Sequence, residues 1–393
     1  MREYTRIVKH IVAKFGDFVY NKIMKVIFGG AFNPPHAEHI NMVKRLLTRD
    51  DVESVILLPS VNPPHKSCPT SFEQRLDMLR LATEGLRNVE ISDFERNGEG
   101  KRYTCEVLPK LKEIYGDVAF VIGGDSLVDL DKWKNPSDVI KICPLLVFTR
   151  GESEKFTAAL SYWRNQGGDI RVCDYSPLDV SSTVIRYNAE LGIYDNLDGK
   201  VVEYIKANNL YAKYKDLIAK LKSNIPTKTF EHCLRTASYA INLNYSLNLG
   251  LDYDKVLIAG VLHDCAKALC HAPHDTSEVP EDCIGTPVEH QFLGAVVARK
   301  EYGIEDEEIL GAIKYHTTGK KDMSDLQKLI FSSDMLEIGR VYDGVEALRD
   351  AMRKSLDLGY KACALAQYEF LLQKGGDIYP LTLEAVEDID KKH

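Results

Sequence analysis

The sequence lacks several features that would assign it to a membrane or to a nucleic acid. None of its apolar runs is long enough to cross a bilayer, and charged residues interrupt the apolar runs at the start, so we expect neither a membrane span nor a signal peptide. The nine cysteines include no C-x-x-C pair, and their odd number favours free thiols in a reducing, cytoplasmic compartment. A net charge of −8 lacks the basic excess that non-specific nucleic-acid binding needs.

Two common nucleotide-binding motifs are also missing. There is no G-x-x-x-x-G-K-[ST], which excludes a P-loop protein, and no G-x-G-x-x-G at the first turn, which disfavours a dinucleotide-type Rossmann site. The composition, 45% hydrophobic and 27% charged, is that of a globular protein. Because 393 residues exceed one typical core, we expect two domains. The sequence leaves open whether copies of the chain form a homo-oligomer.

The stretch from Val26 to Ile40 predicts a phosphate site. An apolar run ends in Gly29 and Gly30, and His36 and His39 stand before an amphipathic run, which predicts a strand, a tight turn and a helix N-terminus. Glycines let the backbone approach a phosphate, and a helix start offers free N–H groups to it. Residues three apart share one face of the first helical turn, so the two imidazoles could stabilise charge on a phosphoryl group.

Further apolar runs end in polar residues, as expected at the ligand-binding edge of a parallel sheet. We expect strands at 55–59, 89–92, 118–122 and 145–150 and helices at 72–81 and 104–111. Asp125 follows a strand and a Gly-Gly pair, where it binds a ligand or caps a helix. Trp133 could stack on a flat heterocycle or simply pack in the domain. Lys66 could reach a phosphate or be a solvated surface lysine.

A second phosphate cradle is predicted where three hydroxyls precede an arginine by one helical turn. These residues are Ser181, Ser182, Thr183 and Arg186. A capping box is the alternative, but no Glu or Gln stands at the required offset.

Over about residues 24–211, the chain resembles the bacterial nicotinate mononucleotide adenylyltransferase family. The segment Gly29–His39 resembles the HxGH signature of the nucleotidyltransferase superfamily, although Glu38 replaces its usual glycine. A carboxylate there is tolerated beside a phosphate only if it points away. Later matches are Pro63–Lys66, Tyr103–Thr104, Gly123–Ser126 with Trp133, Ser181–Arg186 and Val202–Tyr211.

This resemblance implies a Rossmann-like α/β domain that transfers an adenylyl group from ATP to nicotinate mononucleotide, with Mg²⁺ bridging the oxygens of the leaving pyrophosphate. It implies that His36 and His39 are catalytic and stabilise the α-phosphoryl transition state, and that Trp133 stacks on the pyridine ring. The implied ATP- and substrate-binding residues are Gly29, Gly30, Phe32, Asn33, Lys66, Thr104, Gly123, Asp125, Trp133, Arg150, Ser181, Ser182, Thr183 and Arg186.

The second half has a different pattern. A lysine-rich helical stretch from Ala212 to Ile225, broken by Pro226, indicates a boundary near 212, and beyond it apolar residues recur only at helical spacing. We therefore expect an N-terminal extension over 1–23, a nucleotidyltransferase domain over 24–211 and an all-α domain over 212–393.

Histidines and aspartates on successive apolar helices predict a metal site in this second half. A single buried histidine is usually a satisfied core residue, but four with two aspartates form a ligand set that suits transition metals in a helical bundle. The six residues are His232, His263, Asp264, His290, His316 and Asp334. By contrast, His271 and His274 stand in a proline-containing loop, and we expect them to be solvated.

The order of these ligands resembles the HD-domain metal-dependent phosphohydrolases. From about residue 213 to the end, His263–Lys267, His316–Gly319 and Asp334–Glu337 with Arg340 look like the HD-type family that hydrolyses diadenosine tetraphosphate symmetrically. The resemblance implies a helical bundle with a dinuclear centre, with iron expected and Mn, Co or Zn as alternatives, and two ADP as products.

It also implies roles for these residues. One metal would be held by His232, His263, Asp264 and Asp334, and the other by Asp264, His290 and His316, with Asp264 as the catalytic carboxylate. Lys267 and Arg340 are candidate phosphate contacts or, alternatively, partners in surface salt bridges.

The sequence also allows other functions for each half. The first half could be another adenylyltransferase of the same fold, such as a pantetheine-phosphate adenylyltransferase. The second could be an HD phosphodiesterase with another nucleotide specificity, or a non-catalytic HD module that binds nucleotide and regulates the first half. All of these take small-molecule nucleotides as partners.

Overall fold

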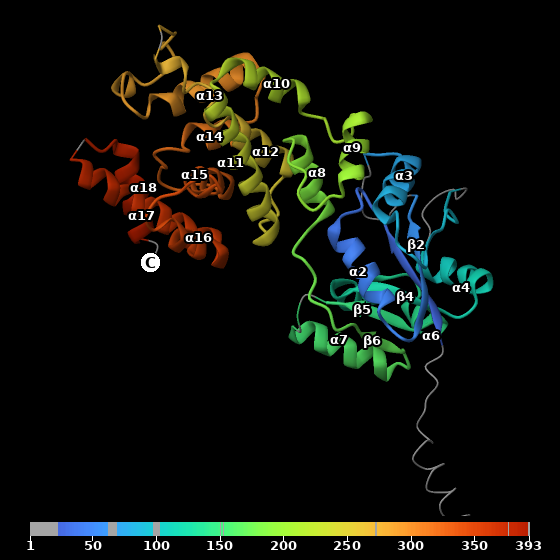
Figure 1. The fold of residues 1–393 in the computed structure, drawn as a ribbon. Coiled ribbons are helices and arrows are strands. Elements are labelled where there is room, and N and C mark those ends of the chain that lie inside the picture. The colour runs from blue at the N-terminus through green and yellow to red at the C-terminus, as the bar shows by residue number, and fades with distance from the viewer. Residues whose placement is uncertain are drawn as a thin grey trace, which may run out of the picture. The chain divides into compact units, whose positions relative to one another are not determined.

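The computed structural model describes residues 23–61, 69–96, 103–149, 151, 153–271, 273–375 and 377–391. The expected extension up to residue 22, Lys66 and Arg150 therefore lie outside the described residues. The chain forms two compact units (Figure 1). Unit 1 comprises the described residues up to Leu178 together with Asn196–Asn208, and unit 2 comprises Asp179–Asp195 and the described residues from Asn209 onward. The segment Asp179–Asp195 thus groups with the helical unit, before the expected boundary at 212.

Unit 1 contains a six-stranded parallel sheet. Its strands are β1 (Met24–Gly30), β2 (Val52–Pro59), β3 (Val89–Ile91), β4 (Val118–Gly123), β5 (Leu145–Phe148) and β6 (Ile170–Val172). Their order in the sheet is β3-β2-β1-β4-β5-β6, and every pair is parallel. The order reverses between β1 and β4, where such sheets bind ligands beyond their carboxyl ends. The sheet confirms the predicted Rossmann-like α/β class.

Helices pack on the sheet and bury an apolar core against it. Neighbouring β1 residues Val26 and Ile27 are both fully buried, yet they belong to different apolar clusters. Because successive side chains point to opposite faces, both faces of the sheet are covered. The helices of unit 1 are α2 (Ala37–Leu47), α3 (Phe72–Thr83), α4 (Thr104–Tyr115), α5 (Gly124–Val128), η1 (Leu130–Lys132), α6 (Pro136–Ile142), α7 (Glu154–Asn165) and α9 (Gly199–Ala207).

The described residues of unit 2 form helices joined by loops and contain no strand, which confirms the predicted all-α second half. Its helices are α8 (Ser182–Glu190), α10 (Lys215–Asn224), α11 (Thr227–Ser246), α12 (Tyr253–Leu262), η2 (Leu269–His271), η3 (Glu281–Cys283), α13 (Glu289–Tyr302), α14 (Glu307–Lys314), α15 (Asp325–Leu336), α16 (Val345–Lys354), α17 (Leu356–Lys374) and α18 (Pro380–Lys391). Within the described ranges, no helix is both long and apolar enough to cross a membrane.

Close packing of α11 against α12 and α15 positions the predicted metal ligands. Gly260 on α12 lies so near α11 that an added Cβ would stand 2.6 Å from the Cα of Ala237. This short separation brings together His232, five residues before Ala237, and His263, three residues after Gly260.

Candidate phosphate site and metal centre

The loop between β1 and α2 brings His36 and His39 together in unit 1. Their rings overlap with centroids 3.7 Å apart. His36 is the N-cap of α2, with extended φ and ψ of −137° and 173°, and so stands one position before the first turn where we expected it. Its backbone N–H donates to Nδ1 of His39 over 3.2 Å. Since that Nδ1 accepts, the neutral His39 ring carries its proton on Nε2, a donor suited to an anion.

Glu38, which replaces the usual glycine of the signature, is bound to another segment. One carboxylate oxygen, Oε2, accepts hydrogen bonds from the hydroxyl of Tyr175 at 3.0 Å and from the backbone N–H of Leu178 at 2.8 Å. Burial, together with Glu38, raises the pKa of Tyr175 to about 12, so the phenol stays a donor. Glu38 therefore ties α2 to the segment after β6. It also lines a cavity of about 530 Å³, so its carboxylate is held in place but stays beside the candidate site.

Two cavities at the carboxyl ends of the strands collect other predicted residues. One, of about 530 Å³, is lined by Gly123, Gly124 and Asp125. The other, of about 430 Å³, is lined by Gly29 and Gly30, and also by Tyr103, Thr104 and Trp133. The structure thus divides these predicted substrate residues into two sets. The first lies at the end of β4 and the second at the end of β1.

Phe32 and Asn33, which were expected to bind substrate, are buried in the loop itself. The Phe32 ring packs edge-on against His39 with centroids 5.0 Å apart. The Asn33 side chain accepts a hydrogen bond from Thr70 over 2.7 Å. A Cβ on Gly30 would approach the Phe32 ring to 3.0 Å, so glycine permits this packing. The Phe32 ring therefore supports His39, and Asn33 ties the loop to Thr70.

The predicted cradle of hydroxyls begins helix α8 in unit 2. The Ser181 hydroxyl caps the helix by accepting from the backbone N–H of Thr183 over 3.2 Å. Arg186 donates from Nη2 to the Thr183 hydroxyl over 3.1 Å. The serine and threonine hydroxyls and the guanidinium therefore gather at a helix start, as expected, although Ser181 also serves as an ordinary cap.

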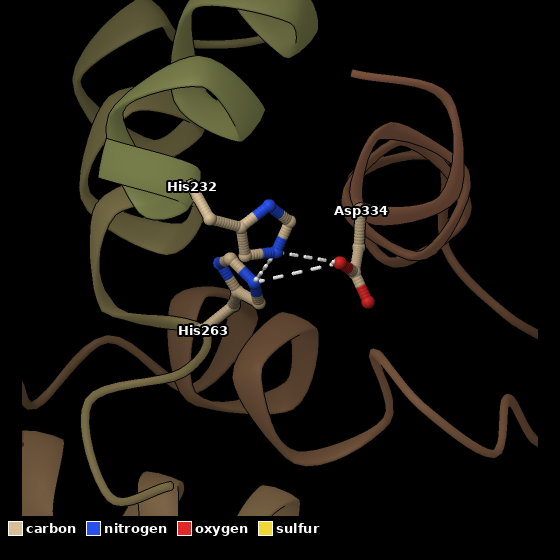
Figure 2. Close-up of side chains that lie close together, drawn as sticks. All are labelled: His232, His263 and Asp334. Atoms are coloured by element: carbon tan, nitrogen blue, oxygen red, sulfur yellow. Dashed lines mark hydrogen bonds and ion pairs between the residues drawn. The ribbon is translucent and has the colours of Figure 1, made fainter. Parts of the chain in front are cut away.

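All six predicted metal ligands come together in unit 2. Figure 2 shows His232 from α11, His263 from the end of α12 and Asp334 from α15 pointing toward one another. His232 Nε2 lies 3.2 Å from His263 Nε2 and 2.8 Å from Asp334 Oδ1, and His263 Nε2 lies 3.8 Å from the same oxygen. These atoms are close enough to share one metal ion.

A second set of ligands shares Asp264 with the first. His290 Nε2 and His316 Nε2 are 3.2 Å apart, and each lies 3.5 Å from Asp264 Oδ1. The other carboxylate oxygen, Oδ2, lies 3.6 Å from His263 Nε2 and 3.9 Å from His232 Nε2. The carboxylate of Asp264 therefore extends between the two sets and presents one oxygen to each.

The outer nitrogens of the four imidazoles orient the inner ones. Nδ1 of His263, His290 and His316 lies 2.7–2.8 Å from a backbone carbonyl oxygen three residues earlier. A carbonyl can only accept, so Nδ1 carries the proton and Nε2 points its lone pair at the centre. Nδ1 of His232 instead lies 3.1 Å from Oε1 of Glu337. The donor set of imidazoles and carboxylates fits divalent transition metals.

Burial and neighbouring charges fix the protonation of these ligands. Burial lowers the pKa of His263 and of His290 to about 4, so both rings are neutral at pH 7 and free to ligate. Burial alone would raise the pKa of Asp264, but His263, His316 and Lys267 outweigh it and hold this pKa well below its usual range. Asp264 is therefore an anion, as a metal ligand must be.

Lys267 and Arg340 lie at the same centre. Lys267 Nζ stands 2.7 Å from Asp264 Oδ2, and Arg340 Nη2 stands 2.6 Å from Asp334 Oδ1. Both side chains are about half exposed. Each cation thus forms an ion pair, as one alternative expected, and its partner is a predicted metal ligand.

One histidine prediction is wrong, and three residues around the centre were missed. His271 is exposed, as expected, whereas the His274 side chain is 15% exposed and its Nε2 lies 2.6 Å from the buried carboxylate of Glu289. The partner comes from α13, so the loop sequence gives no sign of it. The missed residues are Glu337, Gln291 and Thr317. Glu337 and Thr317 had a signal, since they lie in the segments Asp334–Glu337 and His316–Gly319 that carry the resemblance, whereas Gln291 had none.

Comparisons with known proteins match both halves. Residues 27–188 match the cytidylyltransferase-like family model, and residues 229–339 match the HD domain model. A probable nicotinate-nucleotide adenylyltransferase of Clostridium acetobutylicum is 34% identical over 196 residues, which are 48% of this chain and 98% of that protein. A probable nicotinate-nucleotide adenylyltransferase/Ap4A hydrolase of Mycoplasma pneumoniae is 28% identical over 348 residues, 86% of this chain and 96% of that protein.

A solved structure also matches. The crystal structure of a predicted HD superfamily hydrolase involved in NAD metabolism from Clostridium acetobutylicum shares 30% identity. The match covers 46% of this chain and 98% of that chain, with a TM-score of 0.41. Together, the family models and the relatives confirm the two resemblances that the sequence motifs indicate.

Proposed function

We propose that this chain, which belongs to the nicotinate-nucleotide adenylyltransferase family through its first half and carries an HD domain in its second, is an enzyme with two activities. The first is adenylyl transfer from ATP to nicotinate mononucleotide, a step of NAD biosynthesis that yields deamido-NAD and pyrophosphate. The second is metal-dependent, symmetrical hydrolysis of diadenosine tetraphosphate to two ADP.

The paired histidines at the start of α2 support the transferase activity. A phosphate oxygen of nicotinate mononucleotide attacks the α-phosphorus of ATP, the bond from that phosphorus to the bridging oxygen breaks, and pyrophosphate leaves. The Nε2–H of His39 is a donor for the charge that develops on the α-phosphoryl oxygens, and the His36 ring holds it in place. Mg²⁺ bound with ATP would supply positive charge to the leaving pyrophosphate. Positioning and charge stabilisation supply the rate without a covalent intermediate.

The two cavities support the choice of substrates. Trp133 at the 430 Å³ cavity offers an aromatic face to a pyridine ring. Asp125 and the backbone of Gly123 and Gly124 line the 530 Å³ cavity, which is large enough for a nucleoside. The phosphate contacts assigned to Ser181, Ser182, Thr183 and Arg186 stay predictions.

Replacing His39 by alanine tests the transferase activity. We expect deamido-NAD formation to fall by a factor of about 100 or more, because a donor to the developing charge is lost. Activity equal to that of the wild type would contradict the assignment. Replacing His271, which is exposed in unit 2, provides the matched histidine control.

The carboxylate of Asp264 between two ligand sets is the observation that carries the hydrolase activity. The two sets would hold two divalent ions, for which iron is our expectation, and these supply Lewis-acid charge and an activated water. Lys267 and Arg340, which pair with the ligand carboxylates, would then contact the phosphate chain. The His and Asp donors also accept Mn, Co and Zn.

A product assay tests the cleavage pattern. Purified protein is incubated with diadenosine tetraphosphate, other dinucleoside polyphosphates and mononucleotides, with and without chelator, and the products are separated. We expect two ADP from diadenosine tetraphosphate, and loss of this product with chelator. ATP plus AMP, or ADP that persists in the chelated protein, would contradict the proposal.

A further inference from the structure

We propose that Thr317 is a catalytic residue of the HD unit, whose hydroxyl donates a hydrogen bond to a phosphoryl oxygen of the bound nucleoside polyphosphate. This inference rests on the proposed phosphohydrolase function and adds to it a substrate contact. Thr317 follows the predicted ligand His316 directly, in the turn after α14.

The Thr317 hydroxyl faces the candidate metal centre. Its Oγ1 lies 3.0 Å from Nε2 of His290. The same Nε2 lies 3.2 Å from Nε2 of His316 and 3.5 Å from Oδ1 of Asp264. The hydroxyl thus borders the set formed by His290, His316 and Asp264, although a neutral hydroxyl adds no charge to that set.

The protonation of Nδ1 in the His290 ring decides which partner donates in this hydrogen bond. Nδ1 of His290 lies 2.8 Å from the carbonyl oxygen of Pro287, which can only accept, so Nδ1 carries the ring proton. Nε2 therefore has a lone pair, and the Thr317 hydroxyl is the donor in its contact with Nε2. A metal ion held by His290 would use that same lone pair.

Metal binding would thus leave the hydroxyl hydrogen of Thr317 directed at the centre and in need of another acceptor. Asp264 Oδ1, the carboxylate oxygen of the same set, would ligate the same ion. The acceptors that remain at a phosphohydrolase centre are the activated water and a substrate phosphoryl oxygen, and the second is the one that we assign to Thr317. A hydroxyl bond to a charged phosphoryl group is stronger than one between neutral groups.

The surrounding residues fix Thr317 in this orientation. Its backbone N–H donates to Oε1 of Gln291 over 3.1 Å, and its carbonyl accepts from Nε2 of Gln367 over 2.6 Å. Gln291 is fully buried in α13. The hydroxyl of the next residue, Thr318, donates to the Gly319 carbonyl over 2.8 Å and accepts from Nε2 of Gln291 over 2.9 Å. Of the two adjacent threonines, therefore, one holds the turn and the other presents a hydroxyl to the site at little reorganisation cost.

Two substitutions separate the hydroxyl from the rest of the side chain. Thr317→Val keeps the shape and removes the donor, whereas Thr317→Ser keeps the donor. In the metal-loaded full chain, we expect Thr317→Val to lower kcat/KM for diadenosine tetraphosphate by about 10- to 100-fold and to weaken ADP binding, measured by calorimetry, while the metal content is unchanged. Thr317→Ser should retain most of both. Thr227→Val, at an exposed position on α11, controls for the exchange itself.

The outcomes distinguish this inference from the proposed function. Wild-type kcat/KM and ADP affinity in Thr317→Val would overturn the inference and leave the hydrolase intact. Equal losses in the Val and Ser variants, or a fall in metal content in Thr317→Val, would also overturn it, because the residue would then act through the fold or the metals. If the wild type hydrolyses no nucleotide, the proposed function fails, and the inference with it.

Discussion

Glu38 shows how one residue can depart from a motif and still fit the fold. Its carboxylate accepts hydrogen bonds from Tyr175 and from the backbone of Leu178, both far along the chain. A carboxylate next to a phosphate site would repel the ligand, but this one is held by two donors on another segment. At the residue scale, therefore, glutamate in place of the usual glycine restricts the backbone but adds two hydrogen bonds, which hold α2 against the segment after β6.

Glu38→Ala should remove this tether. We expect the free energy of unfolding of unit 1 to fall by about 1–3 kcal/mol, because two donors lose a charged, buried acceptor. Urea unfolding followed by circular dichroism measures the loss. Glu113→Ala on α4, where the side chain is exposed, is the matched control and should change stability by less than about 0.5 kcal/mol. Equal stability of the wild type and Glu38→Ala would show that the tether contributes nothing.

Glu337 acts on the metal centre through His232. Its Oε1 lies 3.1 Å from Nδ1 of His232, and its Oε2 accepts from Arg235 over 2.8 Å. Burial alone would raise the pKa of Glu337, but the bonds to His232 and Arg235 outweigh it and lower the pKa to about 2. The carboxylate is thus charged at pH 7 and fixes the tautomer and orientation of the ligand.

Glu337→Gln should weaken metal binding by about 10- to 100-fold, because an amide orients the imidazole less strongly than a carboxylate does. Competition with a chelator of known affinity measures the change, and Glu369→Gln on the exposed face of α17 serves as the control. Unchanged metal affinity in Glu337→Gln would mean that His232 is held by other contacts.

At the scale of elements, the metal centre depends on the close contact between α11 and α12. Gly260 has no room for a side chain, since an added Cβ would lie 2.6 Å from Ala237 Cα and 2.9 Å from its Cβ. Gly260→Ala should therefore force the helices apart, lower stability by about 1–3 kcal/mol and reduce metal content. Thermal unfolding and metal analysis test this prediction.

A control shows whether the effect comes from the contact. Gly199→Ala, at the start of α9, meets nothing within 4 Å and should be neutral or slightly stabilising. If Gly260→Ala keeps the stability and the metal content of the wild type, the helix contact does not position the ligands.

Helix α8 is joined to unit 2 by a polar cluster around Asp254 on α12. The Tyr187 hydroxyl donates to Asp254 Oδ1 over 2.7 Å, and Lys213 Nζ lies 2.5 Å from Oδ2. Burial alone would raise the pKa of Asp254, but bonds from Lys213, Tyr187 and Tyr214 outweigh it and lower the pKa below its ordinary value of 3.8. These contacts explain why the segment from Asp179 groups with the helices.

The lowered pKa sets the pH dependence of this cluster. A carboxyl group whose folded pKa lies below its unfolded pKa stabilises the fold above the unfolded value, near 4, and this contribution is lost as the pH falls through the folded value. Asp254→Asn should therefore cost about 1 kcal/mol at pH 7, and the difference from the wild type should shrink below about pH 4. Urea unfolding at several pH values checks this, and a pH-independent difference would contradict it.

For the whole molecule, local patterns predicted more than non-local ones. Continuous apolar runs that end in Gly-Gly pairs or polar residues predicted the parallel sheet, and histidines and aspartates on successive helices predicted the six ligands that converge. The sequence could not predict the contact of Tyr175 with Glu38 or of His274 with Glu289, because the partners are distant or carry no pattern of their own. The grouping of α8 with the helical unit is of the same kind, since it depends on Asp254.

The molecule carries two phosphate chemistries in two compact units, and one pair of variants can separate them. His39→Ala and Asp264→Ala are each assayed for deamido-NAD formation and for hydrolysis of diadenosine tetraphosphate, with the wild type alongside. Asp264 is the carboxylate shared by both ligand sets, so its loss should remove the hydrolysis by a factor of at least about 100 and lower the metal content.

We predict a crossed result for this measurement. His39→Ala should lose adenylyl transfer and keep hydrolysis, and Asp264→Ala should lose hydrolysis and keep adenylyl transfer. Loss of both activities in either folded variant, or loss of neither activity in both variants, would contradict the presence of two independent catalytic sites in one chain.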